Sequence, residues 1–499
     1  MKNINRSIKV LITLVLILSL FGCSDKSKDS DNKVKGDEKL YKDRVITVIV
    51  PNIGNKLVRG PIMEEAKRFE QQTGAIVRVV TPRWLDTINK VKESLVDPKI
   101  NFDIFVIITS WGGSLFSENH IANVPDWVKD KIQWDDVLPI YKNSILSWDN
   151  KSYGLPYDGD CINLYYRKDI FNDKKNKAKF LKEFGYELEA PSTWKKYEDI
   201  AKFFNGWDWD NDGKIEYGMV GNRSMGFASI LQFFTQAAAY TKHPEDVAFY
   251  FDIDTMKPRI NNHGFVKALE DYIYIMKYGP KEILNLQIHD IRKSFITGEV
   301  AMAIDWSDMG TMAANSEMSI VKDKIGYALL PGYDKVYNSK TNSWDKQLNK
   351  PSSIAGNWTI LVNKDSKNKK LAFEFASHMT SAKLTKKLTT MGWTGINPSR
   401  YSHFNDIDAW ADSGFSKNSA KEYLNTISES LNNKNVMVDI RIPGASRYYE
   451  QVSKYIDLAL RGKMEPKEAL DNAALKWDEI TDSLDRDKQI ELYKKSLNK

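Results

Sequence analysis

A chain of 499 residues with 42% hydrophobic content is long enough for two domains of ordinary size with packed cores. Its formal net charge of +6 is spread through lysine-rich segments and is not gathered into one block, which argues against nucleic acid as a partner. Neither a His-Glu-x-x-His motif nor a Gly-x-Ser-x-Gly motif occurs, so the sequence does not support the two hydrolase classes that use them.

The N-terminal segment has the pattern of an export signal. Basic residues open the chain, an unbroken apolar run follows from Val10 to Phe21, and Gly22-Cys23 comes next. The run is short for a membrane-spanning helix, and a small residue before Cys is what lipoprotein processing requires. We therefore predict a signal peptide over residues 1–22 and acylation of the Cys23 sulfur. An ordinary signal peptide with a chance cysteine is the alternative.

Residues 23–43 are predicted to form a flexible tether. The segment after Cys23 consists mostly of Ser, Asp, Lys, Asn and Glu, so it cannot bury enough apolar surface to offset the entropy cost of ordering. No second long apolar run follows, and no transmembrane domain is expected. With Cys23 used for lipid, Cys161 has no disulfide partner within the chain, so stability is expected to come from packing.

The first part of the expected globular body reads as strand, helix, strand, followed by a third strand. The strands are predicted from β-branched or continuous apolar runs at 45–50, 76–80 and 104–108. In open α/β sheets, ligands sit beyond the carboxyl ends of the strands. The segments beyond the second and third strands carry Trp84 and Ser110-Trp111, which are therefore candidate binding residues.

The pattern repeats after residue 150 with longer helices. Thr193 is the predicted N-cap of a helix in which Trp194 lies on the apolar stripe and is expected in the core. Further strands are expected at 162–166, 300–304 and 358–362, and further helices at 291–298, at about 367–379 and through most of the last hundred residues.

A rigid turn precedes the strand at 162–166. Pro and Gly restrict its backbone, and Tyr157, Asp158 and Asp160 sit where one segment passes into the next. Aromatic faces pack on the C–H faces of sugar rings, and carboxylates accept hydrogen bonds from several hydroxyls. Taken alone, this segment fits a surface turn and a binding site equally well.

Six segments, in order along the chain, resemble family 1 bacterial extracellular solute-binding proteins, the lipoprotein receptors of ABC sugar importers. They include Y-G-L-P-Y-D-G-D-C, A-P-S-T-W, F-I-T-G-E-V-A-M-A-I-D-W and I-A-G-N-W-T-I-L-V. The six lie at 153–171, 190–201, 251–262, 295–307, 354–375 and 461–473. The resemblance covers nearly the whole mature chain and is more specific for the family than for the ligand.

The resemblance implies an α/β fold of the periplasmic-binding-protein type, with two lobes, a hinge and an interlobe cleft that holds the ligand. The implied N-terminal lobe comprises 44–155 with 357–398, and the implied C-terminal lobe comprises 156–356 with 399–499. The chain is expected to cross between the lobes near 154–158, 356–359 and 395–399.

One position departs from the family pattern. Where the family commonly has Gly-Gly-Trp, this chain has Gly356-Asn357-Trp358. Asparagine tolerates the left-handed backbone that glycine allows, and its amide is also able to reach a ligand, so both roles remain open for Asn357.

The chain is rich in aromatic residues, with 14 Trp and 23 Tyr. Five tryptophans fall at predicted strand ends or hinge turns and are candidates for stacking on a sugar, with core packing as the alternative: Trp84, Trp111, Trp306, Trp358 and Trp393. The polar candidates are Ser110, Tyr157, Asp158, Asp160, Asp305, Asn357 and Arg447. Trp194, Trp410 and Trp477 lie on helical patterns and are expected in the core.

Residues 208–216 carry the signature of a calcium loop, with oxygen ligands at positions one, three and five and a glycine at position six. Position twelve is Met219, so the usual bidentate glutamate must come from elsewhere or the site is weak. The predicted metal ligands are Asp208, Asp210, Asp212, the Lys214 carbonyl and Glu216. A structural Ca²⁺ is the prediction and an acidic turn without metal is the alternative. No cofactor is expected to be required.

We expect a monomeric substrate-binding lipoprotein that captures a carbohydrate, by preference an oligosaccharide, and delivers it to the membrane subunits of an ABC permease. Its location would be extracytoplasmic, with the lipid as its only contact with the membrane. The competing hypothesis is a secreted carbohydrate-active enzyme in which Asp158 and Asp305 act as paired carboxylates. An adhesin or structural lipoprotein is a third class, but it would not need hinge turns lined with aromatic residues.

Overall fold

The computed structural model describes residues 40–54, 56–97, 99–315 and 317–499. The predicted signal peptide, Cys23 and the tether as far as residue 39 lie outside the described residues. The last part of the predicted tether differs from expectation. The Tyr41 side chain is buried, and the backbone N–H groups of Tyr41 and Asp43 donate to the carbonyls of Thr73 and Gly74 at 3.0 Å each. The compact unit therefore begins at Leu40.

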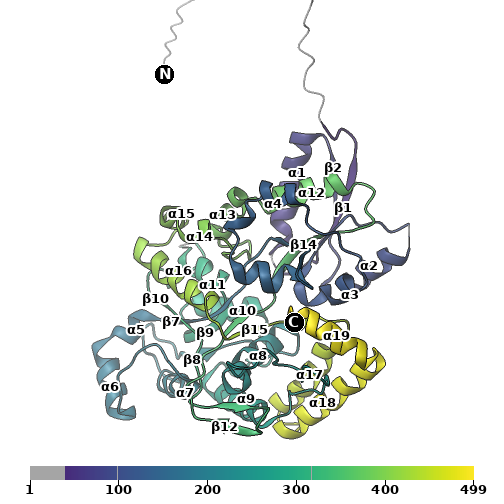
Figure 1. Ribbon diagram of the computed structural model, residues 1–499. Helices are drawn as coiled ribbons and strands as arrows, with labels where there is room; N and C mark the ends of the chain where they lie inside the picture. Colours follow the sequence, from purple (N-terminus) through teal and green to yellow (C-terminus); the bar gives the residue numbers. More distant parts are fainter. Residues whose placement is uncertain (1–39, 55, 98, 316) are drawn as a thin grey trace, which may run out of the picture. The chain divides into compact units, whose positions relative to one another are not determined.

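The first sheet has the strand order β2-β1-β3-β14-β6 (Figure 1). Its strands are β1 (Val45–Ile49), β2 (Ile76–Val80), β3 (Ile104–Ile108), β6 (Leu155–Pro156) and β14 (Trp358–Val362). The first three pair in parallel, whereas β14 runs antiparallel to both β3 and β6. Every residue of β3 and β14 is buried, as continuous apolar runs covered on both faces should be.

The second sheet has the order β15-β13-β7-β9-β8, and β10 also pairs with β7. Its strands are β7 (Ile162–Arg167), β8 (Tyr217–Val220), β9 (Val300–Trp306), β10 (Ile325–Ala328), β13 (Ser352–Ile354) and β15 (Val436–Val438). We call the first sheet with the helices packed on it the first lobe, and the second sheet with its helices the second lobe. Two small hairpins complete the strands, β4 (Ser147–Trp148) with β5 (Lys151–Ser152) and β11 (Val336–Asn338) with β12 (Ser343–Asp345).

Helices of the first lobe include α1 (Arg59–Thr73), α2 (Trp84–Val96), α3 (Gly112–Ser117), α4 (Asp126–Lys131) and α12 (Lys369–Met379), with the 3-10 turn η1 (Thr109–Trp111) between β3 and α3. Those associated with the second sheet include α5 (Lys168–Asn172), α6 (Lys174–Phe184), α7 (Trp194–Phe203), α8 (Phe227–Thr241), α9 (His263–Tyr274), α10 (Ile288–Ile296) and α11 (Asp308–Ala314).

The C-terminal part is mostly helical, as predicted. After α13 (Ala382–Thr390) it contains α14 (Tyr401–Phe404), α15 (Ile407–Asp412), α16 (Lys417–Leu431), α17 (Ala445–Leu460), α18 (Pro466–Ser483) and α19 (Arg486–Ser496). In the ribbon, α17 and α18 lie beside α8 and α9 (Figure 1). Among the described helices, none combines the length and the apolar character needed to cross a bilayer.

Local sequence signals match the observed elements closely. The strands predicted at 76–80, 104–108 and 358–362 have these same bounds. Thr193 caps α7, since its hydroxyl accepts from the Lys196 N–H at 3.2 Å. The tryptophans expected in the core, Trp194, Trp410 and Trp477, are all buried. The strands form two separate sheets, and the lobe boundaries stay a prediction.

Candidate functional site

The three predicted crossing segments lie against one another. The Asn397 backbone N–H donates to Asp158 Oδ1 at 2.8 Å, and the Asn397 amide donates to Asp160 Oδ1 at 2.6 Å. The Asn357 amide donates to the Asp160 carbonyl at 3.2 Å. A methyl group added at Gly159 would lie 2.2 Å from the Pro398 carbonyl oxygen, so glycine is required for this approach. These contacts tie the segments that connect the two sheets.

The crossing between β13 and β14, Ala355 to Trp358, is the centre of the candidate site. The Trp306 indole N–H donates to the Ala355 carbonyl at 2.7 Å, and the Gly356 N–H donates to Asp439 Oδ2 at 2.8 Å. The Asn357 carbonyl accepts from the Thr109 N–H at 3.0 Å. One short segment therefore contacts strand ends from both sheets.

The backbone of this segment corrects one sequence interpretation. The left-handed residue is Gly356, at φ 83°, whereas Asn357 has a φ outside the left-handed region. Asparagine is therefore not present for its backbone tolerance. Its buried amide instead bonds to the Asp160 carbonyl, which leaves its Oδ1 without a partner in the described chain.

An aromatic cluster, defined here as Trp84, Trp111, Trp358, Phe227 and Tyr449, joins the two lobes. The Trp84 ring centroid lies 4.4 Å from Trp111, 5.9 Å from Trp358 and 5.7 Å from Phe227. Phe227 in turn lies 5.2 Å from Tyr449 at an edge-to-face angle. The three tryptophans come from the first lobe and the other two rings from α8 and α17. Three of the five predicted stacking tryptophans are therefore brought together.

Several buried polar atoms beside this cluster have no hydrogen-bond partner within the described residues. They are Thr109 Oγ1, Ser110 Oγ, Asn357 Oδ1 and Asp439 Oδ1. A buried polar atom without a partner costs about 1–3 kcal/mol, so a group of them next to aromatic faces favours a ligand rich in hydroxyls.

The carboxylates of the 157–161 segment are buried and coupled to each other. Burial raises the pKa of Asp158 to about 7, although hydrogen bonds to its carboxyl oppose the shift. Burial, and then the Asp158 charge, raise the pKa of Asp160 well above its usual value. These groups bind protons more tightly than free carboxylates, yet their contacts with Asn397 make them part of the crossing rather than of an open surface.

Asp305 is satisfied within the fold. Its two carboxylate oxygens accept from the Arg292 guanidinium at 3.0 and 3.1 Å, and one also accepts from the Trp306 N–H at 2.7 Å. Arg292 bonds to Asp308 as well, at 2.5 and 2.7 Å. All three charged side chains are buried. The structure thus gives Asp305 an ion-pair partner, and its predicted contact with a ligand stays untested.

Other predicted ligand residues lie apart from the aromatic cluster. The Tyr157 hydroxyl is buried and donates to the Val58 carbonyl at 2.7 Å, and Trp393 packs against Gly60 at the start of α1. Arg447 is exposed on the first turn of α17 and donates to Ser483 Oγ at 3.2 Å. Arg447 is not part of the aromatic cluster, because the buried face of this turn is formed by its neighbours Tyr448 and Tyr449, and its contact with a ligand stays a prediction.

Sequence reasoning missed three residues of the site. Asp439 directly follows the short strand β15, and because the sequence does not predict this strand, the rule that ligands lie beyond strand ends does not reach Asp439. Phe227 begins α8 after Gly226, and Tyr449 lies inside α17. No local signal separates these two aromatic residues from the many that serve only the core.

The predicted calcium loop brings its carboxylates together. Oxygen atoms of Asp208, Asp210, Asp212 and Glu216 lie within 4.8 Å of one another. Gly213 has φ 88°, which provides the sharp turn, and one Glu216 oxygen accepts from the Trp209 N–H at 3.0 Å. Burial, followed by the neighbouring aspartates, raises the pKa of Glu216 to about 7. Such an all-oxygen set fits a hard cation such as Ca²⁺.

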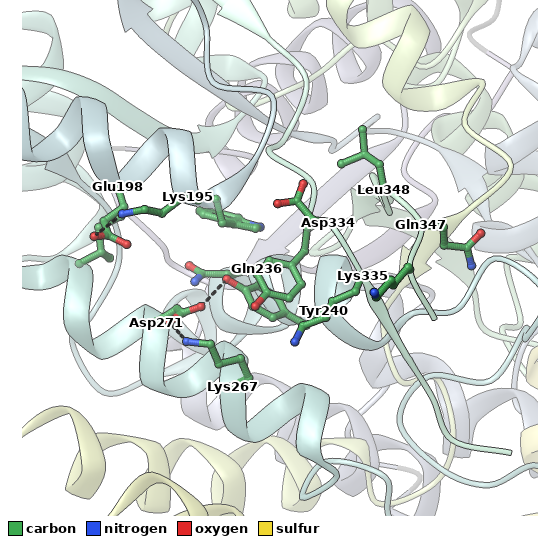
Figure 2. Close-up of a pocket in the computed structure, with 14 residues that line it drawn as sticks. Lys195, Glu198, Gln236, Tyr240, Lys267, Asp271, Asp334, Lys335, Gln347 and Leu348 are labelled. Carbon is green, nitrogen blue, oxygen red and sulfur yellow. Dashed lines mark hydrogen bonds and ion pairs between the residues drawn. The ribbon is translucent and has the colours of Figure 1, made fainter. Parts of the chain in front are cut away.

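A cavity of about 620 Å³ opens elsewhere, in the second lobe. Its lining includes Tyr333. It also includes Lys195, Gln236, Tyr240 and Asp271, which are labelled in Figure 2. Tyr240 donates to Asp271 at 2.9 Å and stacks on Tyr333 with the ring centroids 4.0 Å apart. None of the residues predicted to bind ligand lines this cavity. We place the candidate solute site at the aromatic cluster because both lobes contribute to it.

Comparisons with known proteins agree with this architecture. A mannitol-binding protein of Pseudomonas aeruginosa is 25% identical over 249 residues, which are 50% of this chain and 49% of that protein. A probable amino-acid ABC transporter periplasmic-binding protein of Sinorhizobium fredii is 22% identical over 68% of this chain and 70% of its own length. The match thus spans about half of the first relative.

Solved structures share the two-lobe fold. An ABC transporter solute-binding protein from Agrobacterium radiobacter K84 in complex with ribitol has a TM-score of 0.70 and 21% identity, covering 88% of this chain and 100% of that one. One from Agrobacterium vitis S4 with bound D-mannitol has a TM-score of 0.66 and 19% identity, with coverage of 89% and 99%. The model of a family described as bacterial extracellular solute-binding protein matches residues 64–417. The chain therefore belongs to the bacterial extracellular solute-binding proteins.

Proposed function

We propose that this protein binds a sugar or sugar alcohol between its lobes and passes it, chemically unchanged, to an ABC importer. One observation carries the proposal. Aromatic rings from both lobes meet beside buried oxygen atoms of Ser110, Asn357 and Asp439 that have no partner in the described chain. Aromatic faces and free acceptors together are what a polyhydroxylated solute requires.

The similar proteins support this ligand class. Structures that share the fold hold ribitol and D-mannitol, and a third, maltose-bound T. maritima MalE3, covers 87% of this chain at a TM-score of 0.66 and 18% identity. We extend the proposal to oligosaccharides, because several rings of one chain need several aromatic platforms and the cluster offers more than one.

The aromatic rings contact one another across the lobes, so a solute must part them to enter. We infer that the lobes separate, that the solute then contacts both of them, and that these contacts stabilise the closed arrangement. Capture from dilute medium requires a dissociation constant of micromolar or tighter, which corresponds to about −8 kcal/mol.

The test is a thermal-shift panel of acyclic polyols, monosaccharides and oligosaccharides, followed by calorimetric titration of each compound that raises the melting temperature. We expect at least one polyol or sugar to bind with micromolar affinity and to be recovered intact. Amino acids serve as the control class. Stabilisation by amino acids alone, or by no compound of the carbohydrate classes, would contradict the proposal.

The enzyme alternative finds little support in the geometry. Asp305 is neutralised by Arg292, and Asp158 accepts hydrogen bonds from Gly159 and Asn397. A retaining or inverting glycosidase needs one carboxyl group placed as an acid and one as a free base or nucleophile. Cys161 is buried, and burial raises the pKa of its thiol to about 12, so a thiolate nucleophile is not available either.

As a member of an extracellular family, the protein works outside the cytoplasm. We further propose that Cys23 carries lipid and that the protein acts as a monomer beside the membrane subunits of a permease. Gly22-Cys23 after an apolar run supports the attachment of lipid. Mass spectrometry of the protein extracted from membranes tests it, since acylation adds the mass of the fatty chains to an N-terminal peptide that begins at Cys23.

We also propose that the 208–216 loop binds a structural Ca²⁺. The loop has the expected spacing, and Glu216, nine positions into the loop, contributes a buried carboxylate where the usual position-twelve ligand is missing. The ion would offset the mutual repulsion of four carboxylates.

A further inference from the structure

The 620 Å³ cavity of the second lobe (Figure 2) has the size of a small-molecule site. Its lining comes chiefly from α7, α8, α9 and the two segments that flank the β11–β12 hairpin. On α8, Gln236 at the cavity lies about 14 Å beyond Phe227 of the aromatic cluster, at the helical rise of roughly 1.5 Å per residue. The cavity is therefore separate from the aromatic cluster, and the first lobe contributes nothing to its lining.

The most buried lining residues include aromatic and apolar side chains. Trp194, Tyr240 and Ile275 are 5%, 0% and 3% exposed, and Tyr333 is half-buried. The Tyr240 and Tyr333 rings are stacked with their centroids 4.0 Å apart, which fixes the Tyr333 ring at the cavity wall. Such side chains pack on the C–H faces of a sugar ring or a polyol chain, so this part of the lining suits a carbohydrate.

A buried amide lies among these side chains. Gln236 is 2% exposed, and no hydrogen bond drawn in Figure 2 joins it to another of the lining residues. Its side chain presents an acceptor, Oε1, next to a donor, Nε2. A hydroxyl group both donates and accepts hydrogen bonds, so a ligand with several hydroxyl groups is able to satisfy both atoms of this amide.

The charged lining residues are of both signs and are partly paired with one another. Asp271 accepts from Lys267 at 2.5 Å and from Tyr240 at 2.9 Å, and Lys195 donates to Glu198 at 3.2 Å. The other charged lining residues are Asp334, Lys335 and Lys346. Because no block of one sign lines the cavity, the lining favours a neutral ligand. A paired carboxylate keeps lone pairs and a paired ammonium keeps N–H donors, so Asp271 and Lys267 together suit two adjacent hydroxyl groups.

We propose that this cavity is a second carbohydrate site, which holds one neutral sugar ring or a short polyol through Gln236, Asp271 and Lys267. The first lobe does not line the cavity, so binding here does not require the lobes to close. The inference goes beyond the proposed function and does not depend on it, because the ligand class is argued from the lining of this cavity alone. The protein would then bind carbohydrate at two independent places.

The first test is calorimetric titration of the purified whole chain with two probes, D-mannitol and maltose. We expect two binding events for at least one probe. Gln236→Leu removes the amide from the cavity, so one event should weaken roughly tenfold or more while the other is unchanged. Trp84→Ala should weaken only the other event, which arises at the aromatic cluster. Gln71→Leu, at an exposed position on α1, should retain both events.

These variants separate the two proposals. Binding that responds to Trp84→Ala and not to Gln236→Leu would overturn the second site and leave the proposed function standing. Binding that responds to Gln236→Leu and not to Trp84→Ala would support the cavity and contradict the site at the aromatic cluster.

A second variant keeps the inference testable if Gln236→Leu does not fold. Lys267→Met keeps the aliphatic part of the side chain and removes the N–H donors, so the same binding event should weaken. Lys281→Met, at an exposed position, is its control. Crystals soaked in each probe should show the ligand between Gln236, Asp271 and Tyr333. A cavity that holds neither probe, or one that binds gluconate or free amino acids more tightly than both probes, would overturn the inference.

Discussion

Two tryptophans of the candidate site differ in the contacts that they make. Trp84, at the first position of α2, is half-buried and touches three aromatic rings, but its indole N–H makes no hydrogen bond within the described residues. Trp306 is 7% exposed, and its N–H is bonded to the Ala355 carbonyl. The first residue is suited to stacking on a solute, while the second also holds the crossing segment in place.

Truncation of these two residues should therefore give different results. Trp84→Ala should weaken solute binding roughly tenfold, because a stacking platform is lost, while the unliganded melting temperature changes little. Trp306→Ala should lower the free energy of unfolding by about 3–5 kcal/mol, as expected for a buried tryptophan. Calorimetric titration and urea unfolding measure the two effects. Equal losses of stability in both variants would contradict this distinction between Trp84 and Trp306.

The Asp158 carboxyl predicts a pH dependence of stability. Burial raises its pKa to about 7, whereas the pKa of an aspartate in the unfolded chain is about 3.9. The folded state therefore binds the proton more tightly. The contribution of Asp158 to the free energy of unfolding is therefore fully present below about pH 4 and is lost as the pH rises towards 7.

Asp158→Asn keeps an acceptor oxygen for the Gly159 and Asn397 N–H groups and removes the titration. Between pH 5 and pH 8 the variant should lose less stability in urea unfolding than the wild type. Some slope should remain, because burial also raises the pKa of Asp160 and that of Asp439. Asp126→Asn, at an exposed ion pair, is the control. An unchanged slope in Asp158→Asn would show that its carboxyl is not the group responsible.

At the scale of elements, the site is built from the ends of strands and the segments that follow them. Ser110 and Trp111 lie in η1 directly after β3, Trp358 begins β14, and Asp439 follows β15. The sequence predicts β3 and β14 with their observed bounds because both are continuous apolar runs. It does not predict β15 as a strand, since three residues between two helices carry too weak a periodic signal.

The calcium loop is an element whose function can be tested separately. In the metal-depleted whole chain, millimolar Ca²⁺ at constant chloride should raise the melting temperature by a few degrees, and Mg²⁺ should do so less. Glu216→Gln keeps an oxygen that can accept from the Trp209 N–H but removes one negative charge, so the calcium-specific rise should shrink or vanish. Glu282→Gln, at an exposed position, should behave as the wild type. No response of the wild type to Ca²⁺ would refute the site.

At the scale of the whole molecule, the two lobes approach each other at Gly113. A methyl group added there would lie 2.4 Å from the Ile442 carbonyl carbon, in the segment between β15 and α17. Gly113 belongs to α3 of the first lobe, whereas α17 packs on α8 of the second. The missing side chain therefore permits a contact between lobes.

Gly113→Ala should push α3 away from the Ile442 carbonyl. If the solute-bound state needs this close contact between the lobes, solute binding should weaken by tenfold or more. Overpacking should lower the free energy of unfolding by about 1–3 kcal/mol if the lobes stay in contact, and by less if they separate. Ser114→Ala, the neighbouring change that adds no atoms, is the control. Titration with the solute identified in the panel measures the effect, and wild-type affinity in Gly113→Ala would mean that binding does not require the approach.

The sequence by itself determined the fold class, the family, the longer strands and the chemistry available at the crossings, because these depend on local periodicity, turn residues and segments that resemble a family. It placed Trp84, Trp111 and Trp358 among the candidates without showing that they touch. Only the tertiary structure decided that Phe227 and Tyr449 complete the cluster, that Arg292 neutralises Asp305, and that Gln236 lines a cavity together with residues of α7 and α9. Each of these depends on which distant segments pack together, and long-range packing leaves no periodic signal in the chain.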